Sequence, residues 1–178
     1  MKSHNNAVVI IPPEDVWEPI QAIRSKHDRA FWRWMPHITL IHPFRKLPEH
    51  PLLKKHFEEQ LFSFTTFEIH LKSVQYFMHK SSGFTIWLDP EPSPSIIQLQ
   101  AEIQQIVPDC NDVHLFPAGF HPHLTIASGK GVEQFSLLLN AIKKQWKPLS
   151  FKVSNIYLLH RGKLPEDRFI ISEVVKLS

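Results

Sequence analysis

The sequence predicts a single domain of mixed helices and strands, spanning residues 1–178 and built from two similar halves. At 178 residues, a chain can bury about 70% of the surface that its unfolded form exposes, so one core is sufficient. Apolar residues recur with helical spacing in some segments and with strand-like alternation in others. A five-residue pattern, Pro-His-[Ile/Leu]-Thr-[Leu/Ile], occurs at Pro36 to Leu40 and again at Pro122 to Ile126. This duplication indicates the two halves.

Four segments have the apolar spacing of an amphipathic helix. The first begins with Glu14 and Asp15, at the end of a helix where the dipole favours acidic side chains. The third begins with Ser93 as a candidate N-cap and Pro94 at the first helical position. The predicted helices cover approximately residues 14–26, 49–60, 94–107 and 132–146.

The remaining apolar segments are predicted to be strands. The alternation from Phe67 to Leu71 is typical of a half-buried antiparallel strand, and Ser81 to Gly83 is expected to form a hairpin turn. Gly129 and Gly131 are expected to form the turn after the second copy of the repeated pattern. The predicted strands cover residues 7–11, 37–41, 67–72, 74–78, 84–88, 122–126, 151–159 and 169–177.

Composition excludes several classes of protein. The single cysteine, Cys110, can form neither an intrachain disulfide nor a cysteine-based zinc site, and it favours a reducing compartment. The first apolar run, Ala7 to Ile11, is too short for a signal-peptide core, and the chain has no apolar run of about 18 residues for a membrane span. We therefore expect a cytoplasmic monomer that has no membrane contact and needs no obligate protein partner.

Two residue counts bear on phosphate chemistry. The 5 glycines have neither the GxGxxG nor the GxxxxGK[ST] spacing, so the glycine-built phosphate cradles are absent. Any phosphate must therefore be bound by side chains. The 12 histidines offer groups whose ordinary pKa, near 6.5, suits proton transfer at neutral pH.

The repeated pattern places two of these histidines beside hydroxyl groups. Strand alternation puts His37 and Thr39 on one face, and His123 and Thr125 on the corresponding face of the second copy. If an approximate two-fold relates the copies, these four side chains converge. One histidine could then act as general base and the other as general acid at a phosphodiester. The threonine hydroxyls could donate hydrogen bonds to the non-bridging oxygens.

This chemistry requires neither a metal nor a cofactor. His121 and His123 have the spacing of two metal ligands, but no neighbouring carboxylate or cysteine completes a coordination shell. We therefore predict no metal site.

At these residues the chain resembles the two-histidine (2H) phosphoesterase superfamily, which includes 2′-5′ RNA ligase-like proteins and cyclic phosphodiesterases. The resemblance is carried by His37 to Leu40 and Phe120 to Ile126, and it extends through residues 67–107 and 156–161. It implies a bilobal α+β fold in which two pseudo-symmetric antiparallel sheets line a central cleft and the helices pack outside. It also implies that His37 and His123 form the acid-base pair, with Thr39 and Thr125 as phosphate-binding hydroxyls.

The function that this resemblance implies is metal-independent hydrolysis of a 2′,3′-cyclic phosphate, on a nucleotide or an RNA end, to a 2′-phosphate. Two alternatives remain open: a module that senses a nucleoside 5′-monophosphate with little catalysis, and a 2′-5′ RNA ligase. Several RNA-processing members have an arginine after the second motif, where this chain has Ala127 to Gly129. Together with the net charge of only +3, this favours a small nucleotide or an RNA terminus over a long RNA.

Five further residues are candidates for substrate binding. Trp34, Phe44 and Phe120 flank the two motifs and could stack on a nucleobase. Arg45 and Arg161 could hold a terminal phosphate.

Overall fold

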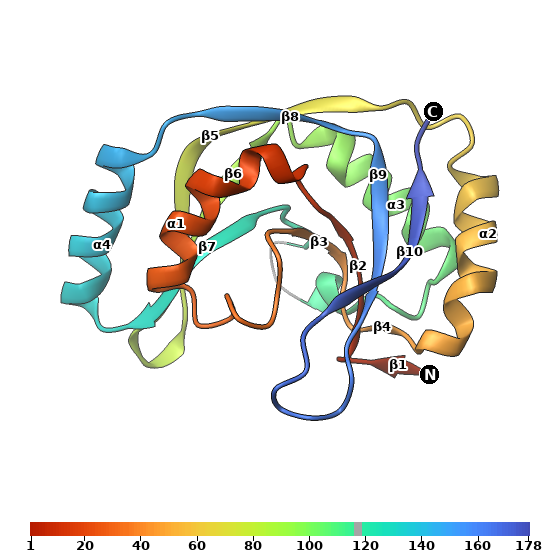
Figure 1. Ribbon diagram of the computed structural model, residues 1–178, viewed down its shortest axis with the longest axis horizontal. Coiled ribbons are helices and arrows are strands. Elements are labelled where there is room, and N and C mark those ends of the chain that lie inside the picture. Colours follow the sequence, from red (N-terminus) through yellow and green to blue (C-terminus); the bar gives the residue numbers. More distant parts are fainter. Residues whose placement is uncertain (116–118) are drawn as a thin grey trace.

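The computed structural model describes residues 1–115 and 119–178 and confirms the α+β fold (Figure 1). Eight antiparallel strands form one curled sheet in the order β10-β9-β2-β3-β7-β6-β5-β8. In sequence order these strands are β2 (Asn6–Ile10), β3 (Ile38–Ile41), β5 (Phe67–Met78), β6 (Gly83–Glu91), β7 (Leu124–Lys130), β8 (Leu149–Val153), β9 (Asn155–His160) and β10 (Ile170–Lys176). A small second sheet pairs β1 (Lys2–Ser3) with β4 (Phe44–Arg45).

The large sheet consists of two four-stranded halves that meet at one residue pair. Between β3 and β7 the register contains Ile38 opposite Leu124 and no other pair of the described residues. By contrast, β7 pairs with β6 along its length, from Leu124 to Lys130. The two predicted sheets are therefore present as halves of one sheet, and we call the Ile38–Leu124 pair the seam.

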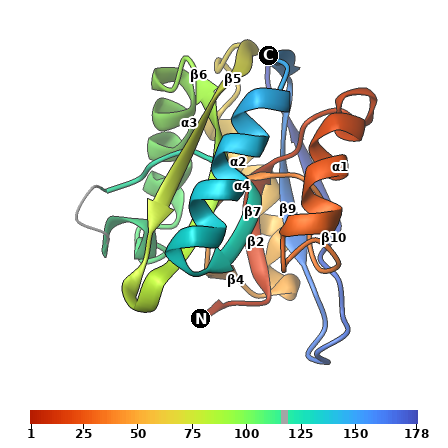
Figure 2. The same cartoon turned by 90° about the vertical axis from the view of Figure 1, so that its left-hand side faces the viewer.

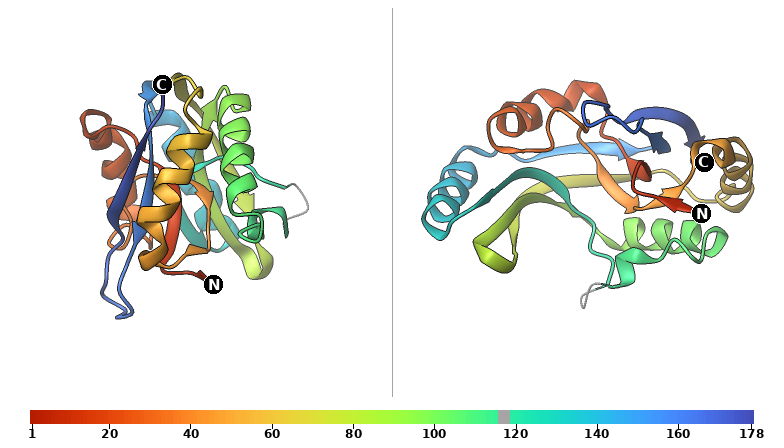
Figure 3. Two further views of the ribbon diagram at one scale, coloured as in Figure 1. Left: turned by 90° about the vertical axis from the view of Figure 1, so that its right-hand side faces the viewer. Right: turned by 90° about the horizontal axis from the view of Figure 1, so that it is seen from below.

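The four predicted helices are α1 (Trp17–His27), α2 (His50–Gln60), α3 (Pro94–Ile106) and α4 (Val132–Gln145). The first begins three residues later than expected, because residues 14–16 form a 3-10 turn. Helices α2 and α4 lie at opposite ends of the long axis, and α1 and α3 on opposite sides of the molecule (Figures 1 and 2). Seen from below, the strands lie between these helices (Figure 3). None of the helices in residues 1–115 and 119–178 combines the length and apolarity of a membrane span.

Each half of the chain contributes to the other half of the sheet: the first half contributes β5, and the second contributes β9 and β10. Strand β5, which follows β2, β3 and α2, pairs with β6. Strand β9, which follows β6, β7 and α4, pairs with β2. This exchange interlocks the two halves and repeats the same connectivity on both sides of the seam.

Successive side chains along β3 and β7 point alternately to the core and to the opposite face of the sheet. Ile38, Leu40, Leu124 and Ile126 are fully buried in the main core, to which all four helices also contribute side chains. The intervening residues of both strands point to the opposite face. The aliphatic residues of the repeated pattern thus anchor the strands and leave the polar ones available.

The structure differs from the predicted strands at three places. The strands predicted over residues 67–72 and 74–78 are one strand, β5. Strand β7 continues to Lys130, and Gly129 lies within it opposite Phe84 rather than in a turn. A Cβ on Gly129 would lie 2.6 Å from the Phe84 ring, so this glycine is required for close packing. Only Gly131, with φ of 101°, forms the expected turn. The strand predicted over residues 151–159 is two strands, β8 and β9, because the chain crosses between two regions of the sheet near Ser154.

Candidate active site

The seam brings the two His-Thr pairs onto one face of the sheet. Because Ile38 lies opposite Leu124 in an antiparallel register, position 37 faces position 125, and position 39 faces position 123. His37 and His123 are therefore diagonal neighbours across the seam, a relation in which residues are about 7–8 Å apart and their Cβ atoms are somewhat closer. Thr39 and Thr125 are both partly exposed there. The four side chains form a group that we call the His-Thr quartet.

The two histidines make the same hydrogen bond. In His37, Nδ1 lies 2.8 Å from the carbonyl oxygen of Met35, two residues earlier. In His123, Nδ1 lies 2.7 Å from the carbonyl oxygen of His121, again two residues earlier. A carbonyl can only accept, so each Nδ1 carries the proton and donates it. In the neutral ring, Nε2 then holds the free lone pair and can accept a proton.

Both histidines are held in their neutral form. Burial, as the largest cause, lowers the pKa of His37 from 6.5 to about 3, against the opposing hydrogen bond to Met35. The positive charge of Arg24 lowers the pKa of His37 further, as does that of a protonated His123. Burial is also the largest cause that lowers the pKa of His123, against the opposing hydrogen bond to the His121 carbonyl, and the neighbouring His121 imidazole lowers it further. The two sites are thus similar in geometry but differ in the fixed charge beside them.

This neutral state predicts a pH-dependent stability. An unfolded histidine binds a proton near pH 6.5, whereas native His37 does so only near pH 3. The contribution of neutral His37 to the free energy of unfolding is therefore complete above about pH 6.5. It declines as the pH falls towards 3, by up to about 1.4 kcal/mol per pH unit. Urea unfolding measures the free energy of unfolding at pH 7 and at pH 4.5. Between these two pH values it should fall less for His37→Asn than for the unmodified chain. An equal loss in both proteins would contradict the prediction.

Trp34 does not offer a free face to a nucleobase. Its ring stacks on His37 at 4.4 Å between centroids and on Phe169 at 3.5 Å. The His37 and Phe169 rings must lie on opposite faces of the indole, because at these distances two rings stacked on the same face would overlap. The stacking role expected for Trp34 is therefore corrected: this side chain supports His37 and packs with Phe169 in a small second core.

A different pair of aromatic residues lies beside His123. Trp87 is opposite Thr125 in the β6–β7 register, so the two side chains share a face. The Trp87 ring stacks on Phe77 at 4.8 Å, and both rings contact His123 by their edges, at 5.8 Å and 5.2 Å. Sequence reasoning missed this pair. The signal that could have revealed it is strand alignment, which places Trp87 beside the second motif.

Three of the expected binding residues make contacts with other parts of the protein. Phe44 is fully buried and packs against His50 and Phe57, so it has no exposed face for a base. Phe120 is partly buried against the main core. The Arg45 guanidinium forms an ion pair with Asp109 at 2.6 Å. Core packing therefore accounts for Phe44, whereas the Arg45 guanidinium is partly occupied by its ion pair with Asp109.

Arg161 lies on the His37 side of the site. Its guanidinium is 5.7 Å from the centroid of Phe169, the ring that covers Trp34. Its charge also acts on His42, whose pKa is lowered mainly by burial. Arg161 therefore remains a candidate for binding phosphate next to the quartet.

In residues 1–115 and 119–178, no three His, Cys, Asp or Glu side chains are grouped so that they could hold a metal ion.

The curled α+β sheet and its paired His-x-Thr strands are those of the two-histidine phosphoesterases. The chain belongs to the 2′-5′ RNA ligase superfamily, whose family model matches residues 12–164. A comparison with curated protein sequences finds no significant match.

Solved structures show the same fold at low sequence identity. Escherichia coli LigT, in a structure complexed with 3′-AMP, is similar with a TM-score of 0.64 and 17% identity over 100% of this chain and 99% of that one. TT0787 of Thermus thermophilus is similar with a TM-score of 0.64 and 16% identity over 99% and 98% of the two chains. Kluyveromyces marxianus Usb1, with uridine monophosphate, is similar with a TM-score of 0.50 and 10% identity over 98% of both chains.

Proposed function

We propose that this protein is a metal-independent cyclic phosphodiesterase that hydrolyses the 2′,3′-cyclic phosphate of a nucleotide or an RNA end to a 2′-phosphate. The observation that carries the proposal is the His-Thr quartet. It presents two imidazole Nε2 atoms and two hydroxyls on one face of the sheet, in matched settings across the seam. Hydrolysis of a diester needs one proton removed and one delivered, and the quartet provides a group for each.

In this mechanism a water molecule attacks phosphorus while neutral His37 accepts its proton at Nε2. The bond between phosphorus and the 3′ oxygen breaks, and protonated His123 donates its Nε2 proton to that oxygen. The products are a 3′-hydroxyl and a 2′-phosphate. The hydroxyls of Thr39 and Thr125 donate hydrogen bonds to the non-bridging oxygens, where negative charge increases in the transition state. Proton exchange with water restores both histidines.

The assignment of His37 as the base is supported by its surroundings. The buried Arg24 cation disfavours a second positive charge on His37 and so preserves its free lone pair. His123 has no such fixed cation among the groups that affect its pKa. A bound phosphate anion would favour its protonated form, which is the form that an acid requires.

A nucleotide ligand is supported by the structural relatives. The E. coli LigT structures include complexes with 3′-AMP, with NADP+ and with ATP, and the Usb1 structure contains uridine monophosphate. In this chain, the aromatic rings around the quartet and Arg161 would contact the base and a further phosphate. The proposal retains the expectation that the protein acts as a monomer in the cytoplasm.

Incubation of the purified protein with the four nucleoside 2′,3′-cyclic phosphates tests this function. We expect ³¹P NMR to show conversion to the 2′-phosphate at an equal rate with and without EDTA. No turnover, together with calorimetric binding of a 5′-monophosphate, would instead support the sensor. Joining of RNA ends bearing a 2′,3′-cyclic phosphate and a 5′-hydroxyl, without hydrolysis, would support the ligase.

A further inference from the structure

Arg24 is a charged residue on the buried side of helix α1. It is 1% exposed, and it forms an ion pair with Asp28, one turn later, at 2.9 Å from Nε. Both side chains of this pair are 2% exposed. A buried ion pair costs desolvation energy that packed apolar residues would avoid, so stability alone is a weak reason for it. The contacts of the guanidinium indicate what else it does.

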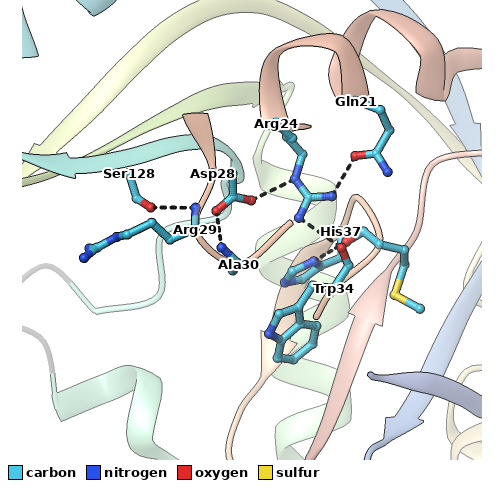
Figure 4. Close-up of polar contacts among 9 residues, drawn as sticks. Gln21, Arg24, Asp28, Arg29, Ala30, Trp34, His37 and Ser128 are labelled. Atoms are coloured by element: carbon cyan, nitrogen blue, oxygen red, sulfur yellow. Dashed lines mark hydrogen bonds and ion pairs between the residues drawn. The ribbon is translucent and has the colours of Figure 1, made fainter. Parts of the chain in front are cut away.

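The guanidinium reaches from α1 to the segment that precedes β3 (Figure 4). Nη1 donates a hydrogen bond to Gln21 in the same helix at 2.9 Å. Nη2 donates to the carbonyl oxygen of Trp34 at 3.1 Å. The hydrogen bonds to Gln21 and Asp28 stay within α1 and its C-cap, whereas the bond to Trp34 reaches ten residues along the chain. It couples α1 to the backbone immediately before the first motif.

The same segment is fixed at its start by the partner of Arg24. The second carboxylate oxygen of Asp28 accepts a hydrogen bond from the backbone N–H of Ala30 at 2.9 Å. The carbonyl of Ala30 in turn accepts from the N–H groups of Arg33 and Trp34, each at 3.0 Å. The ion pair therefore defines both ends of the turn between α1 and Trp34.

Two contacts connect this turn to His37. The Trp34 ring stacks on the imidazole, and the next carbonyl, that of Met35, accepts the Nδ1 proton of His37. Movement of the Trp34–Met35 peptide would move the imidazole and its reactive Nε2 together. A displacement of about 1 Å at a reacting group can cost about 100-fold in rate.

We propose that Arg24 is a positioning residue that orients His37 through the Trp34–Met35 backbone and places a fixed positive charge beside the imidazole. Asp28 holds Arg24 in place and neutralises it towards the rest of the core. The charged and titratable groups that act on His37 come from three parts of the fold: Arg24 from α1, His123 immediately before β7 and His42 after β3. Of these, Arg24 is the permanent cation. The inference rests on the proposed function only for its kinetic consequences.

Variants of Arg24 separate orientation from charge. Arg24→Lys keeps the charge but has a single ammonium in place of the planar fork, so we expect kcat to fall about 10- to 100-fold while the acid limb of kcat/KM remains unchanged. Arg24→Gln removes the charge as well, so we expect a similar fall in kcat and an acid limb displaced to higher pH. Arg29→Gln is the matched control, because Arg29 is exposed in the same turn and its drawn contact uses the backbone N–H (Figure 4).

A measurement without substrate keeps this inference distinct from the proposed function. In an NMR titration, the His37 ring signal, assigned by its absence in His37→Asn, should titrate at higher pH in Arg24→Gln than in the unmodified chain. If Arg24→Gln does not fold, the same titration uses the double variant Arg24→Gln, Asp28→Asn. This variant replaces the ion pair by two neutral amides. Unchanged titration and kinetics in a folded variant would overturn the inference. If the His37 titration changes in Arg24→Gln but the unmodified protein shows no turnover, the proposed function is rejected and the inference about Arg24 stands.

Discussion

Replacement of either His37 or His123 by alanine is expected to lower kcat on a nucleoside 2′,3′-cyclic phosphate by about 10²- to 10⁴-fold. Each variant loses one of the two proton transfers, and no other imidazole of the described site makes the matched Nδ1 hydrogen bond at the seam. Removal of both histidines should cost little more than removal of one, because the two groups act in the same step. Steady-state kinetics at saturating substrate measure this loss.

His56→Ala is the control for these variants. His56 is exposed on α2, outside the quartet, and its loss should leave kcat unchanged. Circular dichroism and thermal unfolding establish that each variant is folded. Full activity in a folded His37→Ala or His123→Ala protein would show that the quartet does not perform the reaction.

A second substrate distinguishes the base from the acid. An aryl phosphodiester has a leaving group that departs as a stable anion, so it needs little protonation. We expect His123→Ala to recover much of its activity on this substrate and His37→Ala to recover little. The opposite pattern would exchange the two roles and would contradict the effect assigned to Arg24.

Replacement of Thr39 or Thr125 by valine is the second change with a large expected effect. Valine keeps the shape and the β-branched form that suit a strand but lacks the hydroxyl that would donate to a phosphoryl oxygen. Loss of one such donor typically lowers kcat by about 10²- to 10³-fold. The two positions are equivalent across the seam, so we expect effects of similar size.

Serine at the same positions provides the control, because Thr39→Ser and Thr125→Ser retain the hydroxyl. These variants should keep kcat within about tenfold of the unmodified chain, since only a methyl group is lost. A rise in KM with unchanged kcat in the valine variants would mean that the hydroxyls bind substrate and transition state equally. That result would remove the threonines from the catalytic step.

The elements of the fold could be predicted because their apolar spacing is regular. The stripe that predicts α3 and the alternation that predicts β5 both depend on residues within one element. The division of residues 149–160 into β8 and β9 could not be predicted, because it depends on which neighbour each strand pairs with. Gly129 was misassigned to a turn for the same reason, since its role depends on Phe84 in another strand.

For the site, the repeated pattern identified the quartet but not its surroundings. Trp34 lies near His37 as expected, yet Phe169, more than a hundred residues later, covers its other face. Arg24 lies one helical turn after Ile20, within the buried stripe of α1, and this position was the available signal for an unusual buried charge. The contacts of Arg24 with the Trp34 carbonyl depend on the packing of α1, which local spacing does not specify.

The seam has a consequence for how the reaction is divided within the chain. In the proposed mechanism, the proton acceptor His37 and the proton donor His123 belong to different halves, so neither half would complete a hydrolysis by itself. With one residue pair at the junction, the distance between the two imidazoles depends on the relative placement of the halves. The exchanged strands fix that placement, because separation of the halves would require β5 to leave β6, and β9 to leave β2 together with its neighbour β10. Chain topology therefore maintains the spacing of the two histidines that we propose as the catalytic pair.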